Sequence, residues 1–189
     1  MLVAGIGNIF LSDDGFGSEV ARRLAAPGAG LPDGVEVGDF GIGGLHLAYE
    51  LLDPPAATIL VDTTRRGGEP GTLYVIEPDP APHPGEGLAP GAGAGAPEGG
   101  ATLDAHGMNP EAVFALLGQL GGTLGRMLVV GCEPARLEEG LGLSPPVAAA
   151  VDEAVALVSR VVGEEVARLP VSHDHPGPGP APGLEPTRR

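Results

Sequence analysis

The stretch LVAGIGNIFLSDDGFGSEVARRL, residues 2–24, decides the fold of this chain. It opens with a short apolar run, Leu2 to Ile6, that is typical of a buried strand. A glycine-containing turn and a polar segment with Asp13 and Asp14 follow. Apolar residues then return at helical spacing, at Phe16, Val20 and Leu24. The stretch therefore predicts a strand, a loop and a helix.

The acidic loop in this stretch has two interpretations. Ligands of open α/β sheets bind outside the carboxyl ends of the strands, so two adjacent carboxylates after the first strand mark a candidate site. Alternatively, Ser12 or Asp13 is an N-cap, and Asp14 is favoured by the dipole of the following helix. On this stretch alone, the cap is the stronger interpretation.

Composition limits the class of protein. The 189 residues suffice for one well-buried domain. Ten arginines and no lysine stand against 25 acidic residues, a net charge of −15, which argues against nucleic acid and anionic membranes as partners. The single cysteine, Cys132, excludes an internal disulfide and fits a reducing cytoplasm. The apolar start is too short for a membrane span and lacks the basic residues of a signal peptide. We expect a cytoplasmic monomer.

The rest of the chain alternates between strand and helix patterns. Four more apolar runs predict strands: Val35 to Phe40, Thr58 to Val61, Gly71 to Ile76 and Met127 to Val130. Three helical stripes lie between or after them: Leu45, Ala48 and Leu52; Val113, Leu116, Leu117 and Leu120; and Val147, Val151, Val155, Val158 and Val162. Asn109-Pro110 and Ser144-Pro145 are typical helix starts. The link from Thr63 to Pro70 is too short for a parallel crossover, so the fourth strand should be antiparallel.

These elements predict an α/β fold, a three-layer αβα sandwich with a mixed, mostly parallel five-stranded sheet and one antiparallel strand. The domain would comprise residues 1–169 and contain a flexible insertion rich in proline and glycine, residues 78–102. We expect residues 170–189 to be a disordered tail.

Three polar residues occupy loop positions where strands end or a helix begins. Asp14 follows the first strand, Asp62 the third, and His106 precedes the third helix. Two carboxylates and an imidazole suit a divalent transition metal, or acid/base chemistry on a bound water. Each also has a simpler interpretation, because Asp62 could cap a turn and a single histidine is more often an ordinary loop residue. The pattern alone leaves both interpretations open.

At these residues the chain resembles the nickel–iron hydrogenase maturation endopeptidases. The similar segments are GIGNIFLSDDGFG (5–17), DFGIGGLHL (39–47), ILVDTT (59–64), GTLYVI (71–76), DAHGMNP (104–110) and VVGCEPARLEEGLGLSPPV (129–147). The resemblance implies an aspartic-type-like endopeptidase that removes the C-terminal extension of the hydrogenase large-subunit precursor after nickel insertion. It also implies that Asp14, Asp62 and His106 are the catalytic and nickel-engaging residues, with no permanently bound cofactor, because the nickel belongs to the precursor. Asp14 is our candidate base; some family members have glutamate at this position.

Two alternatives remain. The same fold could bind nickel or the precursor as a non-catalytic chaperone. Gly5-Ile6-Gly7 with Asp39 weakly resembles a dinucleotide-binding fingerprint, but Phe10 stands where its third glycine belongs. We assign no role to His173-Asp174-His175 in the tail, and Cys132 is expected to be a buried or half-buried residue.

Overall fold

A computed structural model describes residues 1–78 and 110–169 of the chain. Its helices and strands are β1 (Leu2–Ile6), the 3-10 turn η1 (Ser12–Gly15), α1 (Phe16–Leu24), β2 (Glu36–Gly41), α2 (Gly44–Glu50), β3 (Thr58–Thr63), β4 (Leu73–Ile76), α3 (Pro110–Gln119), β5 (Met127–Cys132) and α4 (Pro145–Arg168). His106, Asn109, the tail and most of the expected insertion 78–102 lie outside the described residues.

The five strands form one mixed sheet in the order β2-β1-β3-β5-β4. All neighbours are parallel except β4 and β5, which are antiparallel. This arrangement confirms the expected mixed sheet with one antiparallel strand. Strands β1 and β5 are buried along their whole length, and β3 nearly so, which explains their continuous apolar runs.

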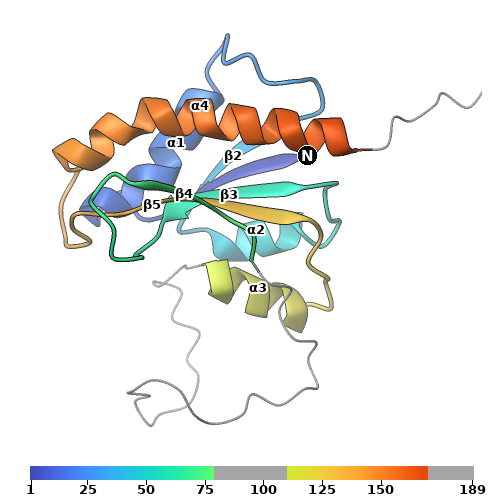
Figure 1. Cartoon of the computed structure of the whole chain (residues 1–189). Helices are drawn as coiled ribbons and strands as arrows, with labels where there is room; N and C mark the ends of the chain where they lie inside the picture. The colour runs from blue at the N-terminus through green and yellow to red at the C-terminus, as the bar shows by residue number, and fades with distance from the viewer. Residues whose placement is uncertain (79–109, 170–189) are drawn as a thin grey trace, which may run out of the picture.

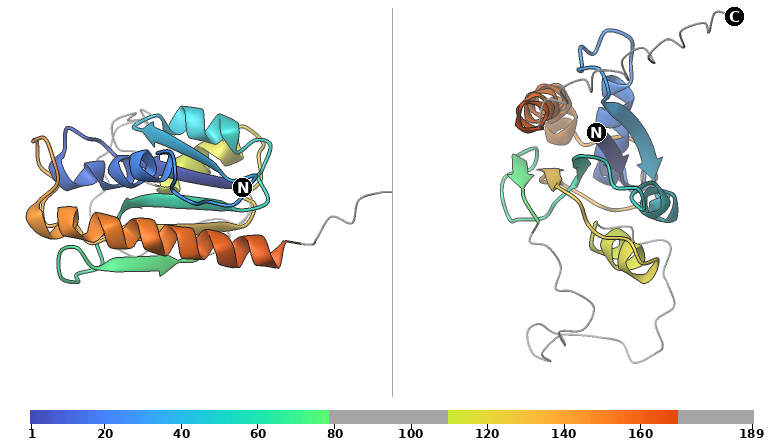
Figure 2. Two further views of the ribbon diagram at one scale, coloured as in Figure 1. Left: turned by 90° about the horizontal axis from the view of Figure 1, so that it is seen from above. Right: turned by 90° about the vertical axis from the view of Figure 1, so that its right-hand side faces the viewer.

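Helices cover both faces of the sheet (Figure 1). Helices α1 and α4 pack on one face, where Phe16, Val20, Val151 and Val158 contribute to a buried cluster. Helices α2 and α3 cover the other face, and Figure 2 shows the two pairs on opposite sides. The three-layer architecture expected from the sequence is therefore present.

Glycines allow α1 to approach the sheet closely. A Cβ atom at Gly17 would overlap the backbone oxygens of Ile6 and Val61, and one at Gly5 would overlap the backbone of Gly17. Since only glycine removes these overlaps, the first turn of α1 rests directly on the carboxyl ends of β1 and β3. The preceding turn, η1, is thereby held at the same edge of the sheet.

Several local expectations were wrong. Neither Ser12 nor Asp13 is the N-cap of α1, which begins after Gly15 without a side-chain cap. Of the stripe expected for α2, Ala48 is buried as predicted, but Leu45 and Leu52 are exposed. Leu47 and Leu51 are buried in their place. Leu120 is exposed because α3 ends at Gln119.

Strand boundaries also differ from the expected ones. Strand β3 continues to Thr63 and β5 to Cys132, because pairing between these strands extends through Asp62–Gly131 and Thr63–Cys132. Asp62 is therefore a buried strand residue and not the loop residue that we expected. Cys132 is fully buried, as expected.

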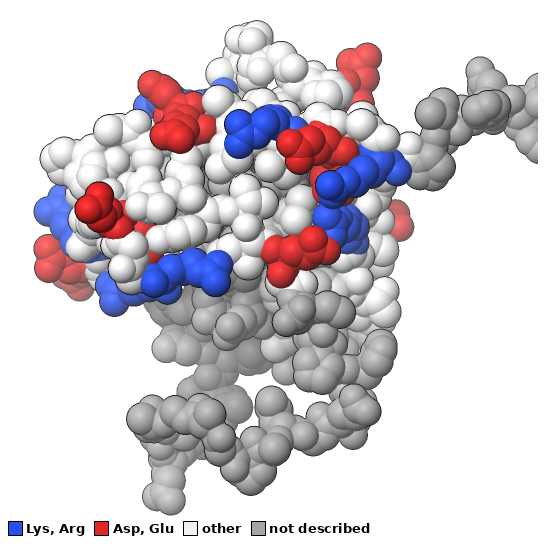
Figure 3. Space-filling view, in the orientation of Figure 1, with Lys and Arg blue, Asp and Glu red and all other residues white. Residues whose placement is uncertain are grey.

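Charged side chains of both signs lie on the described surface (Figure 3). Acidic and basic side chains are interspersed on the face shown in Figure 3, without one continuous basic area. Among the helices of residues 1–78 and 110–169, none has the length and apolar character needed to cross a bilayer.

Candidate functional site

Two of the three candidate residues come together at the carboxyl edge of the sheet. Asp14 lies in η1, which is held against the ends of β1 and β3, and Asp62 is the penultimate residue of β3. Gly7 makes this approach possible, since its φ of +128° is unfavourable for other residues and a Cβ there would overlap the carbonyl oxygen of Asp14. The sheet and its glycines thus bring together carboxylates that are 48 positions apart.

Thr63 connects the two carboxylates, which we call the carboxylate pair. Its backbone N–H donates to Oδ1 of Asp62 at 2.7 Å, and its hydroxyl donates to Oδ1 of Asp14 at 3.2 Å. The second oxygen of Asp14 accepts the N–H of Asn8 at 2.7 Å. The Thr63 hydroxyl also lowers the pKa of Asp62, so Thr63 acts on both carboxylates through its side chain.

Burial dominates the electrostatics of Asp62. Only 5% of the residue is exposed, and removal from water raises the pKa of its carboxyl well above the usual value of 3.8. The neighbouring charge of Asp14 raises this pKa further, while the hydrogen bonds from Thr63 oppose the shift. The two carboxyl groups are therefore close enough to repel each other when both are ionised.

Within the described ranges, no arginine or histidine side chain lies within 4.0 Å of either carboxylate of the pair. These ranges also contain no arrangement of three histidine, cysteine, aspartate or glutamate side chains suited to hold a metal. An uncompensated carboxylate pair attracts a cation, but two side chains do not make a complete ligand set. His106, the third expected ligand, falls in the part of the chain that the structure leaves undescribed.

Asp13 has a different role from its neighbour. It is fully buried and accepts the backbone N–H groups of Ala135, Arg136 and Ser144 at 2.9, 3.0 and 2.5 Å. The Ser144 hydroxyl donates to it as well, at 2.9 Å. Burial alone raises the pKa of Asp13, but these hydrogen bonds outweigh that effect and the pKa lies below 3.8. Asp13 thus ties η1 to the loop between β5 and α4.

Ser144 illustrates the same connection. The sequence correctly predicts this residue as the N-cap of α4, but its hydroxyl makes no capping hydrogen bond. It donates to Asp13 instead. The hydroxyl of a serine at a typical capping position therefore makes a long-range contact, with a residue 131 positions away in the chain.

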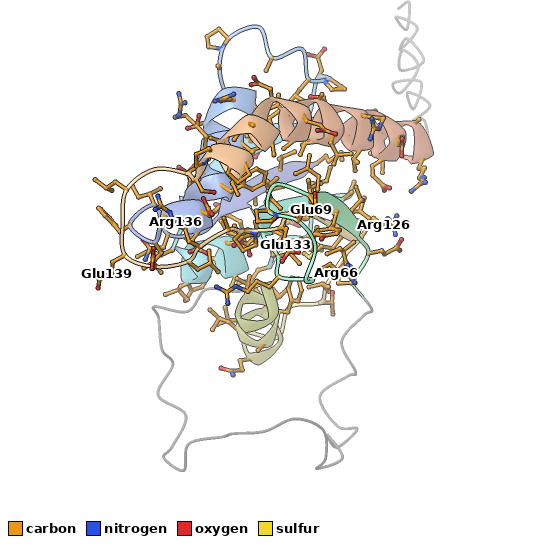
Figure 4. All side chains as sticks on the ribbon, turned by 60° about the vertical axis from the view of Figure 1, so that its left-hand side comes forward. Arg66, Glu69, Arg126, Glu133, Arg136 and Glu139 are labelled. Atoms are coloured by element: carbon orange, nitrogen blue, oxygen red, sulfur yellow. The ribbon has the colours of Figure 1, made fainter. Side chains whose placement is uncertain are left out.

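Glu133 holds the loop that follows the carboxylate pair. The backbone N–H groups of Arg66 and Gly67 donate to it at 2.8 and 3.2 Å, and the Tyr74 hydroxyl donates at 2.9 Å. Burial raises the pKa of Glu133, but these donors and the N–H of Gly68 lower it to a net value below 4.5. Figure 4 shows Glu133 beside the loop that carries Arg66 and Glu69.

A groove of ≈ 480 Å³ lies between α1 and the start of α4. Ile9, Leu143 and Val151 line it, but neither member of the carboxylate pair does. Asp39 also borders the groove, where it accepts the Ser18 hydroxyl at 2.7 Å and the Gly41 N–H at 3.1 Å. Asp39, the candidate ribose-binding acid, thus joins α1 to β2, which gives the dinucleotide alternative no support.

The fold and the carboxylate pair define a three-layer α/β protein with a polar site at the carboxyl edge of its sheet. No family model matches the chain. The hydrogenase expression/formation protein HupD of Rhodobacter capsulatus is 34% identical over 157 residues, which cover 82% of this chain and 68% of HupD. A crystallised hydrogenase 2 maturation peptidase from a Thaumarchaeota archaeon is 28% identical, with a TM-score of 0.56 and coverage of 86% and 97% of the two chains.

The Escherichia coli hydrogenase maturating endopeptidase HybD has the same fold, with a TM-score of 0.61, 24% identity and coverage of 86% of this chain and 91% of HybD. A putative hydrogenase maturation protease of Methanocaldococcus jannaschii is 33% identical over 162 residues, which cover 84% of this chain and 93% of that protein. The identity and coverage of this match and of the HupD match establish the relationship. This chain belongs to the hydrogenase maturation protease family.

No sequence pattern indicates the roles of Asp13 and Glu133, because their hydrogen-bond donors lie between 59 and 131 positions away. The contact between Thr63 and Asp14 was missed for the same reason. The position of Thr63 next to Asp62 in the sequence is the one feature that could have suggested a role for Thr63 in the site.

Proposed function

We propose that this protein is the endopeptidase that removes the C-terminal extension of a nickel–iron hydrogenase large-subunit precursor after nickel has been inserted. The observation that carries the proposal is the carboxylate pair, brought together by the fold without a cationic partner among the described residues. Membership in the hydrogenase maturation protease family supplies the reaction class.

The nickel is part of the substrate in this proposal. Asp14 and Asp62 provide oxygen ligands, and His106 is the proposed third ligand. Three oxygen or imidazole ligands with open positions bind a free ion less completely than a full cage, but they complement an ion already held by precursor thiolates. Cleavage then depends on metal loading.

The carboxylates also suit peptide hydrolysis. Asp14 is more exposed than Asp62, and we assign it the role of general base. It accepts a proton from water as the water oxygen attacks the scissile carbonyl carbon. The carbon–nitrogen bond then breaks, and the proton passes to the leaving amine. A cation near the carbonyl oxygen would stabilise the negative charge that develops there.

The test is incubation of the protein with nickel-loaded and with nickel-free precursor, followed by mass spectrometry of the large subunit. The proposal predicts that the extension is lost only from the loaded precursor. Binding of the loaded precursor without cleavage would instead support the chaperone alternative. Equal cleavage of both precursors would refute recognition of nickel.

A further inference from the structure

We propose that Thr63 is a positioning residue that sets the geometry of the carboxylate pair. This inference rests on the proposed function of Asp14 and Asp62. Thr63 is the one residue in the described part of the chain that donates hydrogen bonds to both carboxylates. It does so with two different groups, its amide and its hydroxyl.

The two contacts differ in what a substitution can remove. The bond from the Thr63 amide to Asp62 Oδ1 belongs to the backbone, so every side chain except proline keeps it. The bond from the hydroxyl to Asp14 Oδ1 depends on the side chain. The hydroxyl also contributes to lowering the pKa of Asp62, beside the larger contribution of the backbone N–H. A substitution such as Thr63→Val therefore removes the contacts of the hydroxyl and keeps the backbone contact with Asp62.

The Thr63 hydroxyl fixes the orientation of the Asp14 carboxylate together with Asn8. One oxygen of Asp14 accepts a hydrogen bond from Asn8 and the other accepts one from Thr63. Asp62 accepts the Thr63 backbone N–H at Oδ1. A carboxylate fixed from both sides keeps its orientation when a substrate arrives, and loss of such supporting hydrogen bonds commonly costs 10- to 100-fold in activity or metal affinity. Without the hydroxyl, the N–H of Asn8 would be the one donor to Asp14 from the described residues.

The neighbouring residue offers a matched control. Thr64 has the same side chain, but its hydroxyl donates no hydrogen bond to a described residue, and its backbone N–H donates to Cys132. Thr63→Val and Thr64→Val therefore make the same chemical change one residue apart. Thr63→Ser retains the hydroxyl and serves as the conservative variant.

The experiment measures the processing of nickel-loaded precursor by the full chain and by these three variants. Thr63→Val is expected to lower kcat by about 10- to 100-fold with little change in KM, because precursor binding extends beyond one hydrogen bond. Thr63→Ser and Thr64→Val should remain within about threefold of the unmodified protein, since both keep the hydroxyl at position 63. Equal kcat for Thr63→Val and Thr64→Val would overturn the proposal.

A second measurement keeps this inference separate from the proposed function. In ¹³C NMR spectra of the isolated protein, the side-chain carboxyl resonance of Asp14 should shift in Thr63→Val and remain in place in Thr64→Val. An unchanged resonance in Thr63→Val would refute the positioning role, whether or not the protein processes a precursor. A shifted resonance in a protein that cleaves no precursor would support the positioning role and refute the proposed function.

Discussion

Asp62 and Glu133 are equally buried, with 5% of each residue exposed, but their surroundings shift their pKa values in opposite directions. Glu133 accepts hydrogen bonds from the loop after β3 and from Tyr74, which compensate for the loss of water. Within residues 1–78 and 110–169, Asp62 accepts hydrogen bonds from Thr63 alone, and it faces the charge of Asp14. Burial therefore does not distinguish the two roles, whereas the number of fixed donors does.

Asp13 and Asp14 repeat this contrast at adjacent positions. From the part of the chain that the structure describes, Asp13 accepts four hydrogen bonds, from Ala135, Arg136 and Ser144, and Asp14 accepts two, from Asn8 and Thr63. We call Asp13 and Glu133 the loop-holding carboxylates. They hold the loops around the site, whereas our proposal assigns the binding of a substrate-borne cation to the carboxylate pair.

Among the substitutions considered, one within the carboxylate pair should have the largest effect on activity. Asp14→Asn keeps the size of the side chain but removes the base, so we expect about a 1,000-fold loss of precursor cleavage, equivalent to about 4 kcal/mol. The thermal unfolding midpoint should stay close to that of the unmodified protein. Cleavage rates and calorimetry of the same preparation test both expectations. Unfolding of Asp14→Asn would place this residue among the loop-holding carboxylates.

Asp13→Ala should have the opposite profile. It leaves the buried N–H groups of Ala135, Arg136 and Ser144 without their acceptor, and we expect a loss of about 3 kcal/mol in unfolding free energy. Denaturant titration measures this loss. Because the folded-state pKa of Asp13 is lowered, its stabilisation is present above pH 3.8 and disappears as the pH falls through the folded-state pKa. Equal stability of Asp13→Ala and the unmodified protein would remove Asp13 from the loop-holding class.

Glu133→Gln should destabilise the fold by about 2 kcal/mol, because an amide replaces one of the two oxygens that accept hydrogen bonds. The change is local, so amide hydrogen exchange should accelerate most at Arg66 and Gly67. Glu69→Gln on the same loop is a control, because its described contacts involve the backbone oxygen of Glu69 and not its carboxylate. Unchanged exchange at Arg66 in Glu133→Gln would show that Glu133 does not hold this loop.

The smallest effect expected is a gain in stability. Asp62→Asn removes a buried carboxyl with a raised pKa, and we expect about 1 kcal/mol of added unfolding free energy at neutral pH. A raised folded-state pKa makes the native Asp62 most favourable below pH 3.8 and progressively costly as the pH rises through the folded-state value. The advantage of Asp62→Asn should therefore vanish at low pH. Urea titrations across this pH range test the sign, and a destabilised variant at neutral pH would contradict it.

Much of the fold followed from the sequence because its determinants are local. Apolar runs identified the five strands, and the short link from Thr63 to Pro70 predicted the antiparallel edge strand. The prediction of the buried face of α2 was wrong at two positions. Leu45, Leu47, Leu51 and Leu52 allow more than one apolar stripe, and packing against the sheet selects Leu47 and Leu51.

The site followed only in part. Asp14 and Asp62 could be placed at one edge of the sheet because carboxyl ends of parallel strands share an edge. The roles of Asp13 and Glu133 could not be predicted, since their hydrogen-bond donors lie far away in the sequence. Asp13 even had a simpler local interpretation as a cap, which the structure contradicts. The place of His106 in the site remains a prediction.

X-ray absorption at the nickel edge would test the central proposal most directly. The sample is nickel-loaded precursor, frozen alone and within the first turnover after mixing with the unmodified protein or with Asp62→Asn. Our account predicts additional oxygen neighbours of nickel in the mixture with the unmodified protein and fewer of them with Asp62→Asn. A nickel spectrum that the protein leaves unchanged would contradict recognition of the metal by the carboxylate pair.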